Sequence, residues 1–337
     1  MKSLRFWLGI VISIVCLYFA FQGIQFDKLL DALREFNYFW LIPASLIFLI
    51  SYFARVFRWQ LLFAPQKIRW HNVFHTLNIG YFLSNLLPAR LGDLVRAYLI
   101  GELEGASKAH ALSTVVVERL SDGLTAVLLL AITALFVPNI PDIAKQGALS
   151  VAIVGVAGIL FLVLISFQKE RGLALLRRLT PPIPFLHSPR LWGALESLID
   201  GFAILRSPRP LIGVAGWALF AWITGGILYW IIMIGSNLQT NGTLLPIQAA
   251  FLVMTITSLA VVVPSSPGYV GVFHFGAQVT LNTVFGVDKS AALSYAFVIH
   301  GFTYLWLIIL GVYSMWYTGW SYQRLQSIEI AAQSKAP

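Results

Sequence analysis

Long runs of hydrophobic residues dominate the chain, and its polar residues gather between them. A helix needs about 20 apolar residues to cross the hydrocarbon core of a bilayer. The runs are continuously apolar, whereas the strands of an outer-membrane barrel alternate with a period of two. The pattern therefore predicts an all-α polytopic membrane protein with about six full transmembrane helices. The six runs cover residues 5–23, 38–57, 110–137, 146–167, 210–235 and 290–317.

Two further apolar stretches, 73–101 and 245–285, are each broken by proline and glycine. Proline removes a backbone donor and clashes with the preceding helical turn. Non-helical backbone at membrane depth is tolerated only inside protein or beside a water-filled cavity. We therefore expect two re-entrant helical hairpins. The residues of their turns, here called the first tip and the second tip, are Pro88 and Gly92 in the first and Pro264, Ser265, Pro267, Gly268 and Gly271 in the second.

The distribution of basic residues orients these segments. Loops rich in Lys and Arg remain in the cytoplasm. The N-terminus carries Lys2 and Arg5, and the loop 168–209 has seven basic residues against three acidic ones. Both segments fall on the same side only if the stretch 73–101 dips into the membrane and returns. The sequence thus predicts a multi-pass protein of the plasma membrane with cytoplasmic N- and C-termini.

The order of the segments repeats. Residues 1–140 and 146–320 each contain two spans, a hairpin and a span, and the second half starts on the opposite side. An inverted-topology repeat of this kind is common in secondary transporters. The whole of 1–320 is then one transmembrane domain, followed by a cytoplasmic tail at 321–337. Residues 188–206 follow helical spacing and predict a cytoplasmic interfacial helix, or else a connector packed on the bundle.

Composition narrows the class of protein. Of the 337 residues, 58% are hydrophobic and 11% are charged, against roughly 25% charged in soluble domains. Positive-inside loops explain the net charge of +9, so no nucleic-acid partner is expected. A nucleotide-binding loop is absent, which excludes an ATP-driven pump for this chain alone. His71 and His75 have no evident third ligand, so neither a metal nor a cofactor is expected.

Three charged residues lie inside the third run: Glu118, Arg119 and Asp122. Charges within a span are expensive and mark functional sites. Glu118 and Asp122 share a helical face, and two close buried carboxylates need a cation or a proton. Arg119, three residues before Asp122, is one candidate partner. A purely structural salt bridge is the alternative, and the two interpretations are compatible.

The first tip adds Arg90, Asp93 and Arg96 at the start of a returning half-helix. A helix N-terminus beside arginines is a ready anion site, and the planar guanidinium suits phosphate. Arg90 pairing with a carboxylate is the simpler alternative. At the end of the second run, Arg55, Arg58 and Trp59 are predicted to be interfacial anchors rather than collectors of lipid headgroups. His300 is a candidate proton relay, although buried histidines are more often packing residues.

Two motifs together resemble a known family. They are Asn85-Leu-Leu-Pro-Ala-Arg-Leu-Gly-Asp-Leu-Val-Arg96 and Glu118-Arg-Leu-Ser-Asp122. They resemble the flippase-like family named for the transmembrane region of lysylphosphatidylglycerol synthase, and the resemblance covers about residues 5–318. That family usually has Glu where this chain has Asp93. The resemblance implies a plasma-membrane flippase module that moves an anionic or aminoacylated phospholipid outward, here a stand-alone member without the aminoacyltransferase domain.

The leading hypothesis is a lipid flippase, a transporter rather than an enzyme. Arg90, Arg96 and Arg119 would hold a lipid phosphate, while Glu118 and Asp122 would balance its charge. The resemblance implies a phospholipid or a polyprenyl-phosphate lipid as cargo, and a separate synthase or envelope-biosynthesis protein as partner. Two alternatives stay open: a membrane-embedded transferase acting on a lipid phosphate, and a non-catalytic accessory subunit. The oligomeric state and the identity of the lipid stay open as well.

Overall fold

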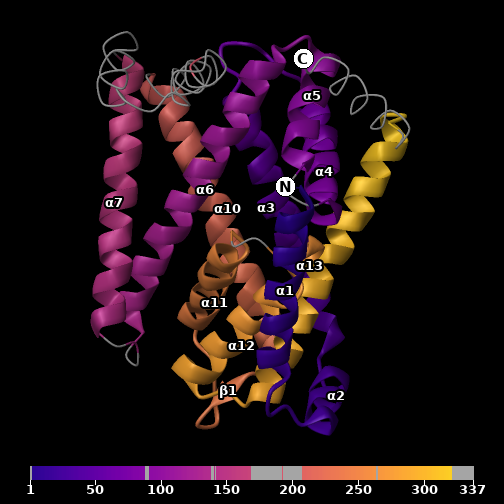
Figure 1. Cartoon of the computed structure of the whole chain (residues 1–337), viewed down its shortest axis with the longest axis vertical. Coiled ribbons are helices and arrows are strands. Elements are labelled where there is room, and N and C mark those ends of the chain that lie inside the picture. The colour runs from indigo at the N-terminus through magenta and orange to yellow at the C-terminus, as the bar shows by residue number, and fades with distance from the viewer. Residues whose placement is uncertain are drawn as a thin grey trace.

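The computed structural model describes residues 2–87, 91–137, 140, 142–167, 192, 207–262 and 265–320. In this part of the chain most residues are helical, and most helices run along the long axis of the molecule (Figure 1). The N-terminal half contains α1 (Lys2–Phe21), α2 (Phe26–Arg34), the 3-10 turn η1 (Tyr38–Trp40), α3 (Leu41–Leu61), α4 (Trp70–Leu86), α5 (Gly92–Glu104) and α6 (Lys108–Phe136). The remainder contains α7 (Asp142–Phe167), α10 (Pro208–Gly235), β1 (Gln239–Thr240), β2 (Thr243–Leu244), α11 (Ile247–Ala260), η5 (Pro267–Tyr269), α12 (Val272–Phe285) and α13 (Lys289–Tyr317).

Three stretches of the described chain are long and apolar enough to cross a membrane: Tyr38–Leu61, Arg209–Gly235 and Lys289–Tyr317. A fourth span would combine Gly9–Phe21 with Phe26–Arg34, although these two helices meet at 89°. The prediction of an all-α, multi-pass membrane protein is therefore confirmed. Six full spans stay a prediction.

Local signals fix several helix ends. The carboxylate of Asp288 accepts from the amides of Ser290 and Ala291 at 2.9 and 3.2 Å, which caps the start of α13. Gly105 ends α5 with a left-handed φ of 65°. The β1–β2 ribbon turns at Asn241 and Gly242, both with positive φ, as two-residue hairpins require. Neither this ribbon nor α2 was expected, since both lie in segments interpreted as loops.

The two predicted hairpins appear as pairs of short helices, α4 with α5 and α11 with α12. They lie in opposite halves of the molecule (Figure 1). Gly92 makes the first pair close: a Cβ there would overlap the carbonyl of Gly80 and the amide of Ser84. Gly80 in turn leaves room for the side chain of Arg96. Whether the two pairs are re-entrant and related by inversion stays a prediction.

The second tip bends through η5, where Gly268 and Tyr269 have φ values of 80° and 55°, and again at Gly271, the N-cap of α12, with a φ of 93°. Helix α1 packs on this tip from far away in the sequence. The hydroxyl of Ser13 accepts from the amide of Ser266 at 2.8 Å, and a Cβ at Gly9 would lie 2.8 Å from the carbonyl oxygen of Ser265. The first long helix is thus a support for the second tip.

Several predicted features lie outside the described residues. They are Pro88 and Arg90 of the first tip, Pro264 of the second tip, the interfacial segment 188–206 apart from Trp192, and the tail 321–337.

Candidate functional site: a buried arginine–carboxylate network

Six charged side chains from three helices meet in the interior. Helix α6 contributes Glu118, Arg119 and Asp122, helix α5 contributes Asp93 and Arg96, and helix α3 contributes Arg58. We call these six residues the charge network. Its members are spread over 65 positions of sequence, from 58 to 122, and the packing of α5 and α3 on α6 brings them together.

Glu118 is the centre of the charge network. Its Oε2 accepts from Arg96 Nη1 at 3.0 Å, and its Oε1 lies 3.4 Å from Arg58 Nη2. The hydroxyl of Tyr81 donates to Oε1 at 3.1 Å. The side chains of Glu118, Arg58 and Arg96 are 0% exposed. Buried charges persist only when they are paired and hydrogen-bonded, so these contacts are a condition for burial.

Asp122 connects α6 to two further helices, α3 and α10. Both of its oxygens accept from the guanidinium of Arg58, at 2.6 and 3.0 Å. The indole of Trp222, on α10, donates to the same carboxylate at 3.1 Å. Asp122 therefore ties α3, α6 and α10 together. The spacing rule had offered Arg119 as its partner, but the described carboxylate partner of Arg119 is Asp93.

Arg119 and Asp93 form the most exposed part of the charge network. Nη2 of Arg119 donates to Oδ1 of Asp93 at 2.6 Å, and Nε donates to Oδ2 at 3.1 Å. The side chain of Arg119 is 31% exposed, in contrast to the buried arginines. Asp93 also lies 3.3 Å from Nε of Arg96, so it connects this exposed part to the centre.

Aromatic faces surround the guanidinium groups. Arg96 lies 4.9 Å from the ring centroid of Trp59 and 5.4 Å from that of Tyr81, and Arg119 lies 5.5 Å from Tyr81. The indole of Trp59 donates to the hydroxyl of Thr114 at 3.0 Å. Cation–π contacts stabilise a guanidinium without supplying negative charge. These rings thus help to hold the guanidinium groups in place without adding negative charge to the site.

The described residues of this region contain one more arginine than carboxylates. Arg58, Arg96 and Arg119 each have a carboxylate partner within the charge network. Arg55, one turn before Arg58, interacts electrostatically with Asp122 and Tyr52, yet it has no ion pair with any described residue. In addition, Nε of Arg58 and Nε and Nη2 of Arg96 donate no hydrogen bond within the described chain. Among the described residues of this region, the arginines therefore carry more positive charge than the carboxylates balance, and they have more N–H donors than the acceptors present can engage.

The structure thus brings together five of the predicted binding residues: Asp93, Arg96, Glu118, Arg119 and Asp122. It adds Arg58 and Trp59, which had been interpreted as interfacial anchors. Sequence reasoning missed Tyr81 and Trp222. For Tyr81, the only signal was a weak one, a tyrosine in the predicted first hairpin. Nothing in the sequence indicated Trp222.

His300 lies elsewhere, beside the second tip. Its Nδ1 is 3.3 Å from Nε2 of His274, whose Nδ1 accepts from the amide of Gly271 at 3.4 Å. A backbone N–H can only donate, so neutral His274 carries its proton on Nε2, and this N–H donates a hydrogen bond to Nδ1 of His300. His300 also has a hydrogen bond with the backbone of Gly268. Among the described residues no carboxylate joins this pair, and the relay role of His300 stays a prediction.

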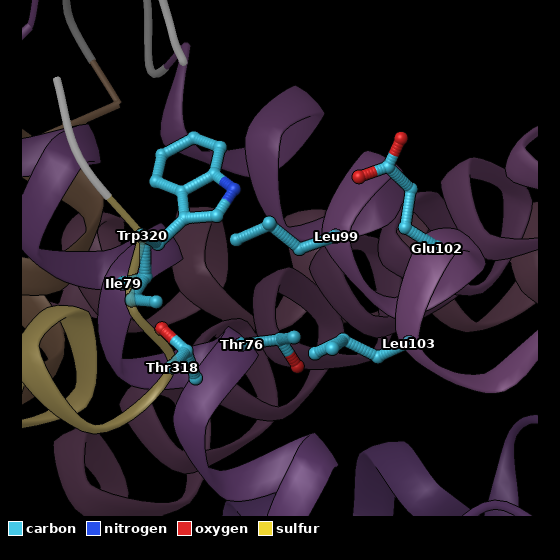
Figure 2. A pocket seen from close by; sticks show the side chains of 7 residues that line it. All are labelled: Thr76, Ile79, Leu99, Glu102, Leu103, Thr318 and Trp320. Atoms are coloured by element: carbon cyan, nitrogen blue, oxygen red, sulfur yellow. The ribbon is translucent and has the colours of Figure 1, made fainter. Parts of the chain in front are cut away.

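Figure 2 shows a separate small cavity between α4, α5 and the end of α13. Its volume is about 40 Å³, which suits ordered water rather than a lipid headgroup. None of its lining residues belongs to the charge network. They are Thr76, Ile79, Leu99, Glu102, Leu103, Thr318 and Trp320.

The chain is similar to a family of known membrane proteins. The family model of the lysylphosphatidylglycerol synthase TM region matches residues 6–311. Glycosyltransferase AglD of Haloferax volcanii is 22% identical over 339 residues; the match covers 91% of this chain but only 53% of that relative, so the chain spans about half of its length. A UPF0104 membrane protein of Methanothermobacter thermautotrophicus is 24% identical, with 92% of this chain and 94% of the relative covered. A UPF0104 membrane protein of Methanocaldococcus jannaschii is 25% identical over 68% of this chain and 91% of the relative. With its helices, its two broken segments and its buried charges, the chain belongs to the family of the lysylphosphatidylglycerol synthase transmembrane region.

Proposed function

We propose that this protein is a flippase that moves a phosphate-bearing lipid between the leaflets of the plasma membrane, with the charge network as its anion site. One observation carries the proposal: the described residues around Asp122 include one arginine, Arg55, more than the carboxylates can pair. A lipid phosphate would supply the missing negative charge. The membrane family supports a role in lipid metabolism.

The geometry at Arg119 explains how a phosphate would enter. Asp93 occupies two N–H groups of Arg119 in parallel, at 2.6 and 3.1 Å. A phosphate matches this fork equally well. Arg119 is the most exposed arginine of the charge network, so the cargo would reach it first and displace Asp93. The carboxylate then acts as a substitute ligand while the site is empty.

The start of α5 supports the same site. The helix begins at Gly92, and its N-cap residue, Leu91, makes no side-chain hydrogen bond to the first amides. Unsatisfied amides at a helix N-terminus favour an anion. Asp93 lies in this first turn, which places the exchangeable carboxylate and the amides together.

Transport would follow from the two pairs of short helices. If both are re-entrant, the tips meet from opposite leaflets, and rocking of one half against the other alternates access to the site. The sequence has no ATP-binding motif, so transport would be passive or ion-coupled. An aminoacylated phospholipid and a polyprenyl phosphate both carry the phosphate group that such a site would bind.

Leaflet exchange in liposomes tests the proposal. Purified protein is reconstituted with fluorescent anionic lipids, and outer-leaflet label is quenched over time. We expect exchange with the wild type and none with Arg119→Ala. Arg69→Ala is the matched control, because Arg69 also pairs with a carboxylate, at 2.9 Å from Glu104, but is 64% exposed and outside the charge network. Equal loss in both variants, or no exchange with any phosphate-bearing lipid, would contradict the proposal.

A membrane-embedded transferase is the second candidate, because one relative is named a glycosyltransferase. Glu118 and Asp122 would then serve as acid and base. Purified protein incubated with a radiolabelled sugar nucleotide and a polyprenyl phosphate would form a labelled lipid, and Glu118→Gln would not. Product formation without leaflet exchange would favour this candidate over the flippase.

A further inference from the structure

We infer that Asn85 is a positioning residue, which couples the second tip to the charge network through Tyr304. Its contribution to transport rests on the proposed function, but the coupling itself does not. Asn85 lies near the end of α4, Tyr304 lies in the middle of α13, and the second tip contacts α4.

The amide of Asn85 bridges two elements. Its Oδ1 accepts from the hydroxyl of Tyr304 at 2.9 Å, and its Nδ2 donates to the carbonyl of Tyr81 at 2.8 Å. A backbone carbonyl can only accept, so the orientation of the amide is fixed by this second bond. Both polar ends of Asn85 are therefore engaged, one toward α13 and one toward its own helix.

One side of this bridge leads into the charge network. Tyr81, whose carbonyl accepts from Nδ2 of Asn85, also donates from its hydroxyl to Glu118 at 3.1 Å. Its ring lies against Arg96 and Arg119. A shift of the α4 backbone at Tyr81 would therefore move a direct ligand of the central carboxylate.

The other side leads into the second tip. A Cβ at Gly268 would lie 2.8 Å from the hydroxyl oxygen of Tyr304, so the tip backbone rests directly on that hydroxyl. The ring of His300 packs edge-on against Tyr304, with centroids 4.6 Å apart, and His300 also bonds the backbone of Gly268. The second tip cannot leave this position without disturbing Tyr304.

These contacts form one continuous chain of hydrogen bonds and packed groups, from Gly268 through Tyr304, Asn85 and Tyr81 to Glu118. Packed interiors switch between discrete arrangements rather than deforming smoothly. Separation of the two tips would break the bond between Tyr304 and Asn85 and release the backbone of Tyr81. Coupling of this kind is reciprocal, so a change at Asn85 must also loosen the second tip.

Hydrogen exchange measured by mass spectrometry tests the coupling on the full chain in nanodiscs. We expect Asn85→Ala to speed exchange several-fold in peptides covering 265–271, although these residues belong to the other helix pair. Ser84→Ala is the matched control, because the neighbouring Ser84 hydroxyl has no hydrogen bond within the described chain. Unchanged exchange at 265–271 in Asn85→Ala would overturn the inference.

Tyr304→Phe removes only the hydroxyl and provides a second variant that should fold. It should speed exchange at 265–271 as Asn85→Ala does, and the double variant should be no faster than either single one. Tyr295→Phe is its control, since that buried hydroxyl, on the same helix, donates to the carbonyl of Tyr229 at 3.0 Å. Additive effects in the double variant would contradict a shared path.

The liposome assay separates the two proposals. If wild-type protein exchanges no lipid while Asn85→Ala still loosens the second tip, the coupling stands and the flippase proposal fails. If the wild type exchanges lipid and neither variant alters the tip, the coupling fails and the flippase proposal stands. If both hold, Tyr304→Phe should slow lipid exchange several-fold more than Tyr295→Phe does.

Discussion

At the residue scale, the site depends on two arginines whose side chains are fully buried. Arg58 and Arg96 are fully buried, and their charge is tolerated only because Glu118 and Asp122 face them. The identity of the charged residues in α6 was predictable, because any charge in an apolar run is conspicuous. Their partners were not. Spacing along one helix favoured Arg119 with Asp122, whereas the partners come from α3 and α5, whose packing is a tertiary property.

We expect Arg58→Ala to lower the free energy of unfolding by about 3–5 kcal/mol, because it leaves two buried carboxylates without their shared partner. Chemical unfolding in detergent, followed by tryptophan fluorescence, measures this. Arg34→Ala should change nothing measurable, since Arg34 is 77% exposed in its ion pair. A smaller loss in the double variant Arg58→Ala with Asp122→Ala would assign the cost to the orphaned charge. Equal stability of wild type and Arg58→Ala would contradict this account.

The indole of Trp222 should stabilise Asp122, because it donates to Oδ1, the oxygen that also accepts from Nη1 of Arg58. Trp222→Phe keeps the aromatic bulk and removes one hydrogen bond to a charged group, which is worth about 1.5–3 kcal/mol. The same unfolding assay measures the loss. Trp217→Phe on the same helix is the control, because Trp217 packs against Phe57 and has no hydrogen bond with a described residue. A larger effect at Trp217 would show that packing, and not the bond to Asp122, decides.

At the element scale, small residues decide how closely helices approach. The breaks at the two tips were predictable from proline and glycine, but the reason for Gly92 was not. Its hydrogen faces the backbone of α4, and only the packed structure reveals that contact. Likewise, α2 was not predicted, because about half of its nine residues are polar and only Leu29 is buried.

Gly92→Ala should separate α4 from α5. A methyl group there would overlap Gly80 and Ser84, and overpacking of this kind costs about 1–3 kcal/mol. Gly216→Ala on α10 is the control: its Cβ would meet nothing within 4 Å, so the gain in helix propensity should leave stability equal or higher. Thermal unfolding of both variants decides. An unchanged melting temperature for Gly92→Ala would refute the close packing.

The end of α5 is tied to the start of α4 by Glu104. Burial raises the pKa of this carboxyl, but hydrogen bonds from Asn72 and Arg69 outweigh burial and lower the pKa below its ordinary value. A lowered pKa stabilises the fold above the unfolded-state pKa, and this contribution disappears as pH falls through the folded-state value. We therefore expect melting temperature to fall less between pH 7 and pH 3 in Glu104→Gln than in wild type. A parallel fall in both proteins would exclude a contribution from Glu104.

At the scale of the whole molecule, two pairs of short helices occupy opposite halves (Figure 1). Tyr304 contacts both pairs, through Asn85 of α4 and Gly268 of the second tip. The order of long and short elements was predictable, because hydropathy and loop charge both report it. The support of the second tip by α1 was not, since Ser13 and Ser266 are far apart in sequence and nothing in either segment marks the other.

The membrane topology can be measured by labelling one position on each side of the membrane. In a Cys16→Ala background, we expect a membrane-impermeant maleimide to label Glu102→Cys only from the cytoplasmic side and Asn241→Cys only from the opposite side. Both positions are exposed; Glu102 lies in the last turn of α5, and Asn241 lies between β1 and β2. Labelling of both from one side would contradict the predicted orientation.

The surplus arginine has an electrical consequence. With Arg55, the described network carries one net positive charge when empty and none when it holds a singly charged lipid phosphate. Moving one elementary charge through 100 mV is worth about 2.3 kcal/mol. On the proposed function, the membrane potential would then act more strongly on the empty site than on the loaded one, and a negative interior would draw the empty site toward the cytoplasm. An imposed potassium diffusion potential should thus bias leaflet exchange in liposomes, and Arg55→Gln should remove that bias.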